Sequence, residues 1–167
     1  MSPSPLIGKL APAFTLKNHD GNDYEFKPES DAPTAIFFYP KSGSYGCTRE
    51  ACQFRDALVG SDAFKGSNLR VIGISPDSVE EQDTFVKKQK LTYPVLSDSA
   101  GEFRKSYGVG KGLLGLTEAR VTYFIDSKGV VRDVLDATIN YGGHVAFVNK
   151  CLAKYANEGR FPKDFVA

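Results

Sequence analysis

An apolar segment that leads through a short loop to two cysteines constrains the fold of this chain more than any other feature. Residues 34–39, Thr-Ala-Ile-Phe-Phe-Tyr, form a continuous apolar run, which is typical of a strand buried on both faces of a sheet. The run ends at Pro40 and a Gly/Ser-containing loop follows. From about Cys47 the apolar residues recur at helical spacing, with Ala51 and Phe54 on one face. The segment therefore predicts a strand–loop–helix unit with a cysteine at the start of the helix.

The position of Cys47 predicts a reactive thiol. The first-turn amides of a helix have no intrahelical partners and carry the positive end of the helix dipole. A thiol at that place is biased towards the thiolate, which is the nucleophilic form. The sequence therefore predicts that Cys47 is a nucleophile rather than a packing residue.

The spacing between Cys47 and Cys52 predicts a redox switch. Cysteines five residues apart on one helix are about 7.5 Å apart along its axis and face roughly 140° apart. The implied Cα separation of about 8 to 9 Å exceeds the limit of about 7 Å for a disulfide. A disulfide between them therefore requires the helix to unwind. The alternative is that Cys52 is a small buried hydrophobic residue.

Composition limits the class of protein. The 167 residues, 41% of them hydrophobic, predict one domain spanning residues 1–167. The net charge of +1 gives no reason to expect nucleic acid or an acidic membrane surface as a partner. The sequence contains no run of about eighteen apolar residues, which a membrane span would need. The N-terminal residues do not resemble a secretory signal. We therefore expect a cytoplasmic protein or one in another reducing compartment; a nuclear location, or an organelle reached with a removed targeting peptide, stays open.

The remaining cysteine and the histidines predict no metal site. Three cysteines are too few for a secreted disulfide scaffold. His19 and His144 are far from the cysteines and from each other in the sequence, and no Cys-x-x-Cys or His-x3-His spacing occurs. Cys151 shares a helical face with Val148 and Leu152, which favours buried packing.

The order of the other segments predicts an α/β fold with a mixed central sheet, flanked by helices, and an N-terminal β-hairpin. The hairpin comprises an edge strand at residues 11–16 and its partner at 23–26. Further strands are expected at 69–75, 94–96, 120–126 and 130–135, and helices at 77–88, 97–107 and around Cys151, with Asp77 or Ser78 as the cap of the first of these helices.

Two segments have no definite interpretation. The Gly/Leu segment 108–117 is either a mobile apolar surface or a plain connection whose leucines pack on the core. In the tail 157–167, Phe161 and Phe165 are expected to hold the chain to the domain, with a dimer contact as the alternative.

The residues around Cys47 also resemble a known family. Pro40-x3-Ser44-x2-Cys47 resembles the active-site signature of peroxiredoxins, and the continuation to Cys52 resembles the branch called peroxiredoxin Q or bacterioferritin comigratory protein. Segments similar to other family motifs follow in the family's order, at 8–14, 97–98 and 120–126. The resemblance implies a thioredoxin-like fold. This sequence departs from the family pattern at Ser44, where threonine is commoner, and at Tyr45, where this branch usually has proline. The loss of that proline is expected to loosen the loop before Cys47.

The resemblance implies roles for individual residues. Cys47 is the peroxidatic residue that becomes a sulfenic acid, and Cys52 is the resolving residue that forms an intramolecular disulfide with it. Arg120 lies beside the sulfur, and the Ser44 hydroxyl binds the peroxide. The amides near Gly46 hold the developing negative charge.

Two further residues have supporting roles by the same resemblance. Pro40 has no N–H and shields the thiolate from water. Glu50 either orients Arg120 or is a solvated helix residue.

The resemblance further implies substrates and partners. They are hydrogen peroxide and organic hydroperoxides, with thioredoxin or a similar dithiol protein as the reductant and no cofactor. A monomer is expected, with a weak dimer left open. Three rival functions remain: a thioredoxin-like disulfide oxidoreductase, which the five-residue spacing disfavours; a redox-regulated binding or chaperone protein switched by the same disulfide; and a non-catalytic structural domain, which would require unremarkable thiol reactivity.

Overall fold

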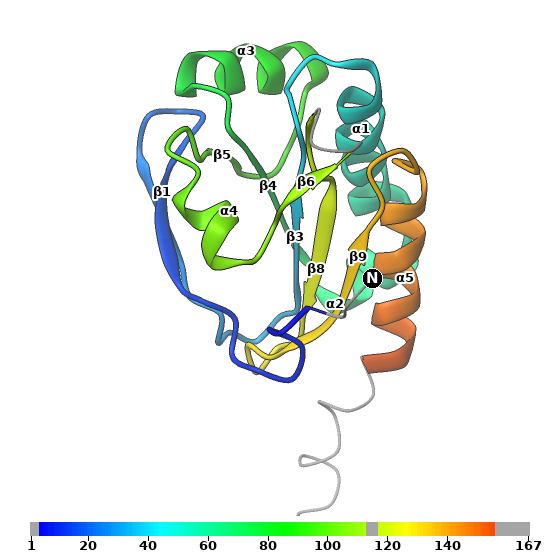
Figure 1. Cartoon of the computed structure of the whole chain (residues 1–167). Coiled ribbons are helices and arrows are strands. Elements are labelled where there is room, and N and C mark those ends of the chain that lie inside the picture. The colour runs from blue at the N-terminus through cyan, green and yellow to red at the C-terminus, as the bar shows by residue number, and fades with distance from the viewer. Residues whose placement is uncertain (1–3, 113–116, 156–167) are drawn as a thin grey trace, which may run out of the picture.

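The apolar run at residues 34–39 forms β3 (Thr34–Phe38), near the middle of a seven-stranded sheet. The computed structural model describes residues 4–112 and 117–155. β3 pairs in parallel with β4 (Arg70–Ser75) and antiparallel with β8 (Val121–Ile125), and all five of its residues are buried. The predicted mixed central sheet is therefore confirmed (Figure 1).

The outer strands complete the order β2-β1-β5-β4-β3-β8-β9. They are β1 (Phe14–Asn18), β2 (Asp23–Phe26), β5 (Val95–Ser97) and β9 (Val131–Asp136). β1 and β2 form the predicted N-terminal antiparallel hairpin. The prediction of an edge strand at residues 11–16 is wrong: the strand begins at Phe14, and its end at Lys17 and Asn18 pairs with β5, so that β2 lies at the edge.

In the part of the chain that the structure describes, five helices cover the two faces of the sheet. They are α1 (Tyr45–Gly60), α2 (Asp62–Ser67), α3 (Val79–Gln89), α4 (Glu102–Ser106) and α5 (Gly143–Tyr155). Side chains of α1, α2, α3 and α5 join the core cluster on one face, and Phe103 of α4 packs on the cluster of the other face. α1 and α5 lie side by side (Figure 1), which brings the helix with both site cysteines against the helix with Cys151.

The alternation of side chains along β3 creates these two cores. Ala35 and Phe37 point to the face covered by α1, whereas Ile36 and Phe38 point to the opposite face. Phe37 stacks on Phe54 of α1 with ring centroids 4.6 Å apart. Burial of this pair fixes the helix that carries the cysteines to the centre of the sheet.

Helix starts follow local capping. Ser78 caps α3 by accepting a hydrogen bond from the Glu81 amide, which decides between the two predicted caps. α4 starts later than predicted, at Glu102, after Gly101 in the left-handed region with φ 74°. Ser97 still belongs to β5, and the Asp98 carboxylate accepts from the Arg104 amide at 2.9 Å, so the predicted first turn of this helix is a loop.

The Gly/Leu segment contains a small two-stranded sheet. β6 (Lys111–Gly112) pairs antiparallel with β7 (Thr117–Glu118). Both interpretations of its leucines lie outside the described residues, as does the expectation for the aromatic residues of the tail.

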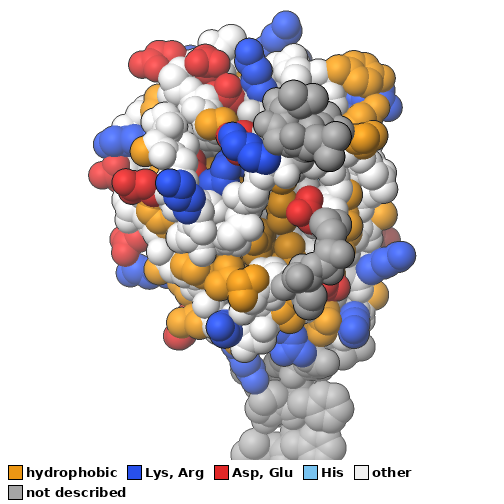
Figure 2. Space-filling model, viewed as in Figure 1, with side chains coloured by type: hydrophobic (Ala, Val, Ile, Leu, Met, Phe, Trp, Pro, Cys, Tyr) orange, Lys and Arg blue, Asp and Glu red, His pale blue; other side chains and the backbone are white. Residues whose placement is uncertain are grey.

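Surface charge is mixed on the face that Figure 2 shows. Basic and acidic side chains alternate over it, with hydrophobic side chains between them (Figure 2). Within residues 4–112 and 117–155, no helix is long and apolar enough to cross a membrane.

Candidate active site

Cys47 lies in the first turn of α1, just after the loop that follows β3, and its side chain is buried. α1 begins at Tyr45 with Ser44 as its N-cap residue, so Cys47 is the third helical residue and lies in the first turn. Its side chain is 1% exposed. The expected combination of a helix start and a cysteine is therefore present, two residues further into the helix than the sequence predicts.

Arg120 lies directly before β8 and contacts the Cys47 thiol. Its Nη1 donates to Cys47 Sγ at 3.4 Å and to Glu50 Oε1 at 3.0 Å. Its Nε donates to the Thr138 carbonyl at 2.9 Å. The guanidinium is therefore held by three partners in a buried position, with its charge directed at the sulfur.

Glu50 is fully buried one turn after Cys47, so the alternative of a solvated helix residue is wrong. Its second oxygen, Oε2, lies 3.5 Å from Nδ1 of His144 on α5. His144 is also fully buried; its Nδ1 is 2.8 Å from the Thr122 hydroxyl and its Nε2 is 3.0 Å from the Ala137 carbonyl. The sequence does not predict His144 as a site residue. The one feature that could have identified it is the occurrence of a histidine in an otherwise apolar helical segment.

Burial shifts the titration of both groups. Loss of water raises the pKa of Glu50 from 4.5 to about 8, although the Arg120 guanidinium acts in the opposite direction. Loss of water lowers the pKa of His144 from 6.5 to about 4, against the hydrogen bond to Ala137. Both shifts disfavour charge on the two side chains and leave Arg120 as the main charge beside Cys47.

Gly46 allows the loop to pass close to Arg120. A Cβ atom at this position would lie 3.0 Å from Tyr141 Cδ1 and 3.1 Å from Arg120 Nη2, so a larger residue would displace the guanidinium. Tyr141 also meets Tyr45 edge to face, with ring centroids 6.1 Å apart. Tyr45 is 70% exposed and carries the Arg49 guanidinium over its ring. Two tyrosines therefore flank the turn that presents Cys47.

Ser44 and Pro40 lie on the loop before α1, and both are partly buried. The Ser44 hydroxyl donates to the Lys41 carbonyl at 2.8 Å and makes no capping bond to the helix. The hydroxyl is therefore at the helix start, in a local hydrogen bond to the preceding loop.

Cys52 lies further along the unbroken α1, and both cysteines are free thiols. Cys52 is partly exposed, and its Sγ lies 3.5 Å from Gln89 Oε1 at the end of α3. Cys47 Sγ instead accepts a hydrogen bond from Arg120, which also pairs with Glu50. The two thiols thus have different surroundings, which agrees with the helical spacing derived from the sequence.

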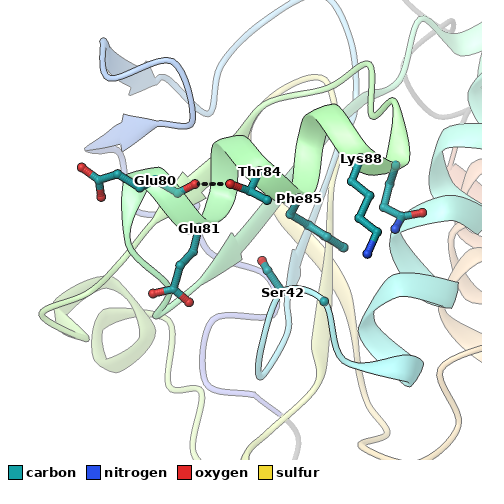
Figure 3. Close-up of a pocket in the computed structure, with 8 residues that line it drawn as sticks. Ser42, Glu80, Glu81, Thr84, Phe85 and Lys88 are labelled. Atoms are coloured by element: carbon teal, nitrogen blue, oxygen red, sulfur yellow. Dashed lines mark hydrogen bonds between the residues drawn. The ribbon is translucent and has the colours of Figure 1, made fainter.

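A cavity of about 370 Å³ lies between α3 and the loop before α1 (Figure 3), and neither Cys47 nor Cys52 lines it. Its walls are the loop at Ser42 and Gly43 and one face of α3, from Glu80 to Gln89. Gln89 is therefore shared between the cavity and the contact with Cys52.

Among the described residues, no three His, Cys, Asp or Glu side chains are grouped as a metal site would require. Cys151 is buried in the core cluster with Val148 and Leu152, as predicted. Burial raises the pKa of its thiol to about 12, so Cys151 is an unreactive packing residue.

Sequence comparison identifies the family. Residues 7–134 match the AhpC/TSA family. The chain is 38% identical over 138 residues to chloroplastic peroxiredoxin Q of Suaeda salsa, which covers 83% of this chain and 63% of that protein. It is 37% identical over 138 residues to chloroplastic peroxiredoxin Q of Sedum lineare, which covers 83% of this chain and 73% of that protein.

Solved structures agree with this result. The crystal structure of peroxidoxin BcpB from Mycobacterium tuberculosis has a TM-score of 0.79 and 31% identity, and covers 92% of this chain and 98% of that chain. The bacterioferritin comigratory protein of Xanthomonas campestris has a TM-score of 0.75 and 25% identity, over 86% of this chain and 92% of that chain. The thioredoxin-like peroxiredoxin fold expected from the sequence is confirmed. The chain belongs to the AhpC/TSA family, and within that family to the peroxiredoxin Q group.

Proposed function

We propose that this chain is a thiol-dependent peroxidase that reduces hydrogen peroxide and organic hydroperoxides. The observation that carries the proposal is the contact of the Arg120 guanidinium with both Cys47 Sγ and Glu50 in a buried site. A buried cation beside a sulfur stabilises the thiolate, which attacks electrophilic oxygen. Family membership supports the same activity, and the Xanthomonas relative has alkyl peroxide reduction activity.

In the first step Cys47 is the peroxidatic residue. Its thiolate sulfur forms a bond to one peroxide oxygen while the O–O bond breaks, so sulfur is oxidised to a sulfenic acid and the peroxide is reduced. The other oxygen leaves as hydroxide or alkoxide and takes up a proton to give water or an alcohol. Arg120 and the amides of Gly46 and Cys47 stabilise the charge that develops on the leaving oxygen. The Ser44 hydroxyl orients the peroxide, and Pro40, which has no N–H, keeps water from the thiolate.

In the second step Cys52 is the resolving residue. Its thiol attacks the sulfenic sulfur of Cys47, water leaves, and an intramolecular disulfide forms. α1 must unwind for this, because cysteines five residues apart on a helix are too distant for a disulfide. A dithiol protein of the thioredoxin type then reduces the disulfide. The cycle uses thiols alone, without haem, flavin or metal.

The proposal extends to the whole chain. Residues 1–167 form a single domain that acts as a monomer in a reducing compartment such as the cytoplasm, without nucleic acid or membrane partners. The relatives from Suaeda salsa and Sedum lineare are named chloroplastic, so an organelle is the alternative location. The match spans less than two thirds of the Suaeda salsa protein.

The test is steady-state peroxide consumption with thioredoxin, thioredoxin reductase and NADPH. We expect Cys47→Ser to abolish consumption, and Cys52→Ser to form the sulfenic acid once without turnover. Cys151→Ser is the matched control: it changes a buried thiol outside the site and should keep full turnover.

Two outcomes would contradict the proposal. Loss of the fast first reaction in Cys52→Ser, with its retention in Cys47→Ser, would reverse the two roles. Consumption of about one equivalent of peroxide by the unmodified protein, with no turnover when reductant is supplied, would favour the redox-regulated binding protein instead.

A further inference from the structure

A fully buried histidine lies against the carboxylate that pairs with Arg120, and the proposed reaction does not use it. His144 comes from α5 and Glu50 from α1, and the shortest contact joins His144 Nδ1 to Glu50 Oε2 at 3.5 Å. Both side chains are 0% exposed. Glu50 and His144 are therefore two titratable side chains buried together near Cys47, and their hydrogen-bond partners determine which atom holds a proton.

The hydrogen bonds of His144 fix its tautomer. Nε2 lies 3.0 Å from the Ala137 carbonyl, and a carbonyl oxygen only accepts, so Nε2 carries a hydrogen. In the neutral ring Nδ1 then has a lone pair, which accepts from the Thr122 hydroxyl at 2.8 Å. The ring therefore presents a basic nitrogen, not a donor, towards Glu50.

Glu50 Oε2 faces this nitrogen without a donor. Arg120 occupies Oε1, whereas buried Oε2 has no hydrogen-bond partner among the described residues. An ionised carboxylate would place negative charge on an unsatisfied buried oxygen opposite a lone pair, which is costly. A proton on Oε2 removes the negative charge and with it this cost.

The other groups around Glu50 allow the same assignment. Arg120 pairs with Glu50 and also contacts Cys47 Sγ, and the Tyr93 phenol is near enough to Glu50 to interact with it electrostatically. Burial raises the pKa of Tyr93 well above its usual value, so the phenol stays neutral. Burial raises the pKa of Glu50 and lowers that of His144, which puts the proton on Glu50 near neutral pH.

We propose that His144 is a positioning residue that keeps one proton on the Glu50–His144 pair and so reserves the positive charge of Arg120 for the Cys47 thiolate. The inference rests on the proposed function. Because Glu50 already holds the proton of the pair, the proton that leaves Cys47 Sγ goes to solvent, and the charge of Arg120 then faces one buried anion, the Cys47 thiolate. Without the pair's proton, the single charge of Arg120 would face two buried anions, which is unfavourable.

The proton balance of peroxide reduction follows from this arrangement. The Cys47 sulfur bonds one oxygen of the peroxide and loses two electrons, and the O–O bond breaks. The leaving oxygen takes up one proton from water, which balances the proton that Cys47 Sγ released, and the products are the sulfenic acid and water or an alcohol. No reactant beyond the thiol and the peroxide is needed.

The test is a thiolate titration of Cys47 by ultraviolet absorbance. A Cys52→Ser/Cys151→Ser background leaves Cys47 as its only cysteine. His144→Gln keeps a donor for the Ala137 carbonyl and removes the basic nitrogen. We expect its titration midpoint to rise by about one pH unit, which is about a tenfold loss of thiolate below the midpoint, with the pH profile of sulfenic acid formation displaced equally.

Two comparisons separate this role from packing. Val148→Ala, on the same helix and fully buried, should lower the thermal midpoint without moving the thiolate titration. Glu50→Gln places a neutral group at the carboxylate, so adding His144→Gln to it should cause no further displacement. If His144→Gln does not fold, His144→Asn also lacks the basic ring and gives the same measurement.

The proposal is overturned if His144→Gln titrates like its parent, or if it displaces the titration equally in the Glu50→Gln background. The measurement needs no peroxide turnover. Failure of the proposal is therefore distinguishable from failure of the peroxidase function, which would leave the titration intact and abolish consumption.

Discussion

At the scale of single residues, Glu50 and His144 make the stability of the protein depend on pH in a defined way. Burial raises the pKa of Glu50 from 4.5 to about 8 and lowers that of His144 from 6.5 to about 4. Between about pH 4.5 and 6.5, the folded and the unfolded chain each hold one proton on these groups, so the pair contributes no pH dependence. As the pH rises from there towards about 8, the folded pair keeps a proton that the unfolded chain has lost, and the free energy of unfolding falls. Below about pH 4.5 the unfolded chain holds two protons and the folded pair one, so the free energy of unfolding falls again.

Urea unfolding between about pH 5.5 and 8.5 checks this prediction. The unmodified reduced protein should lose stability over this range, with a slope that reaches at most about 1.4 kcal/mol per pH unit for the pair, because only the proton that Glu50 keeps makes stability fall as the pH rises. The matched control is Glu50→Gln/His144→Gln, which removes both titrations and should show a flatter profile. Equal slopes in the two proteins would mean that the pair does not titrate as its burial implies.

The residues of the site differ in how far the sequence predicts them. Pro40, Ser44, Cys47 and Cys52 follow one strand within one short segment, so local spacing is enough to group them. Arg120 enters only through the family resemblance, because no local pattern links it to Cys47. His144 is not predicted, since its contact with Glu50 depends on the packing of α5 against α1, and periodicity within one helix does not report the neighbour of another.

At the scale of elements, the start of α1 is open to stabilisation by proline. Tyr45 is the first helical residue, where the N–H has no intrahelical partner and proline is favoured. Ser44 has φ −69° and ψ 157°, which a following proline permits. We expect Tyr45→Pro to stabilise the reduced protein by about 0.4 to 1 kcal/mol relative to Tyr45→Ala, because both lose the contacts with Tyr141 and Arg49 and only proline restricts the unfolded chain. Equilibrium unfolding of the two reduced variants measures the difference, and a less stable proline variant would contradict the prediction.

Element boundaries show where local patterns stop being sufficient. The buried strand β3 is predicted nearly residue for residue because a continuous apolar run defines it, and the hairpin partner β2 has the predicted bounds 23–26. The sequence predicts β1 at the edge of the sheet, whereas the actual strand order depends on the tertiary pairing of β1 with β5. The start of α4 moves because the Asp98 side chain accepts backbone hydrogen bonds that a sequence pattern does not display.

At the scale of the whole molecule, oxidation should destabilise the fold. The reduced α1 is intact, and its Ala51 carbonyl, between the two cysteines, accepts a hydrogen bond from the buried Tyr93 hydroxyl at 2.7 Å. Unwinding to join Cys47 and Cys52 breaks helical hydrogen bonds, each contributing about 0.5 to 1.5 kcal/mol, and leaves the Tyr93 hydroxyl unsatisfied at a cost of about 1 to 3 kcal/mol. It also loosens the packing of Phe54 on Phe37.

The disulfide itself offsets little of this loss, because a loop this short restricts the unfolded chain by only about 2 kcal/mol. We therefore expect the oxidised protein to have a lower thermal midpoint than the reduced one, and residues 46–56 to lose protection in hydrogen exchange. Tyr93→Phe is the matched variant: it has no hydroxyl to leave unsatisfied, so oxidation should lower its midpoint less. Cys52→Ser, given the same oxidant, should keep a protected helix. An oxidised protein that melts higher than the reduced one, with α1 still protected, would show that the disulfide forms without unwinding the helix.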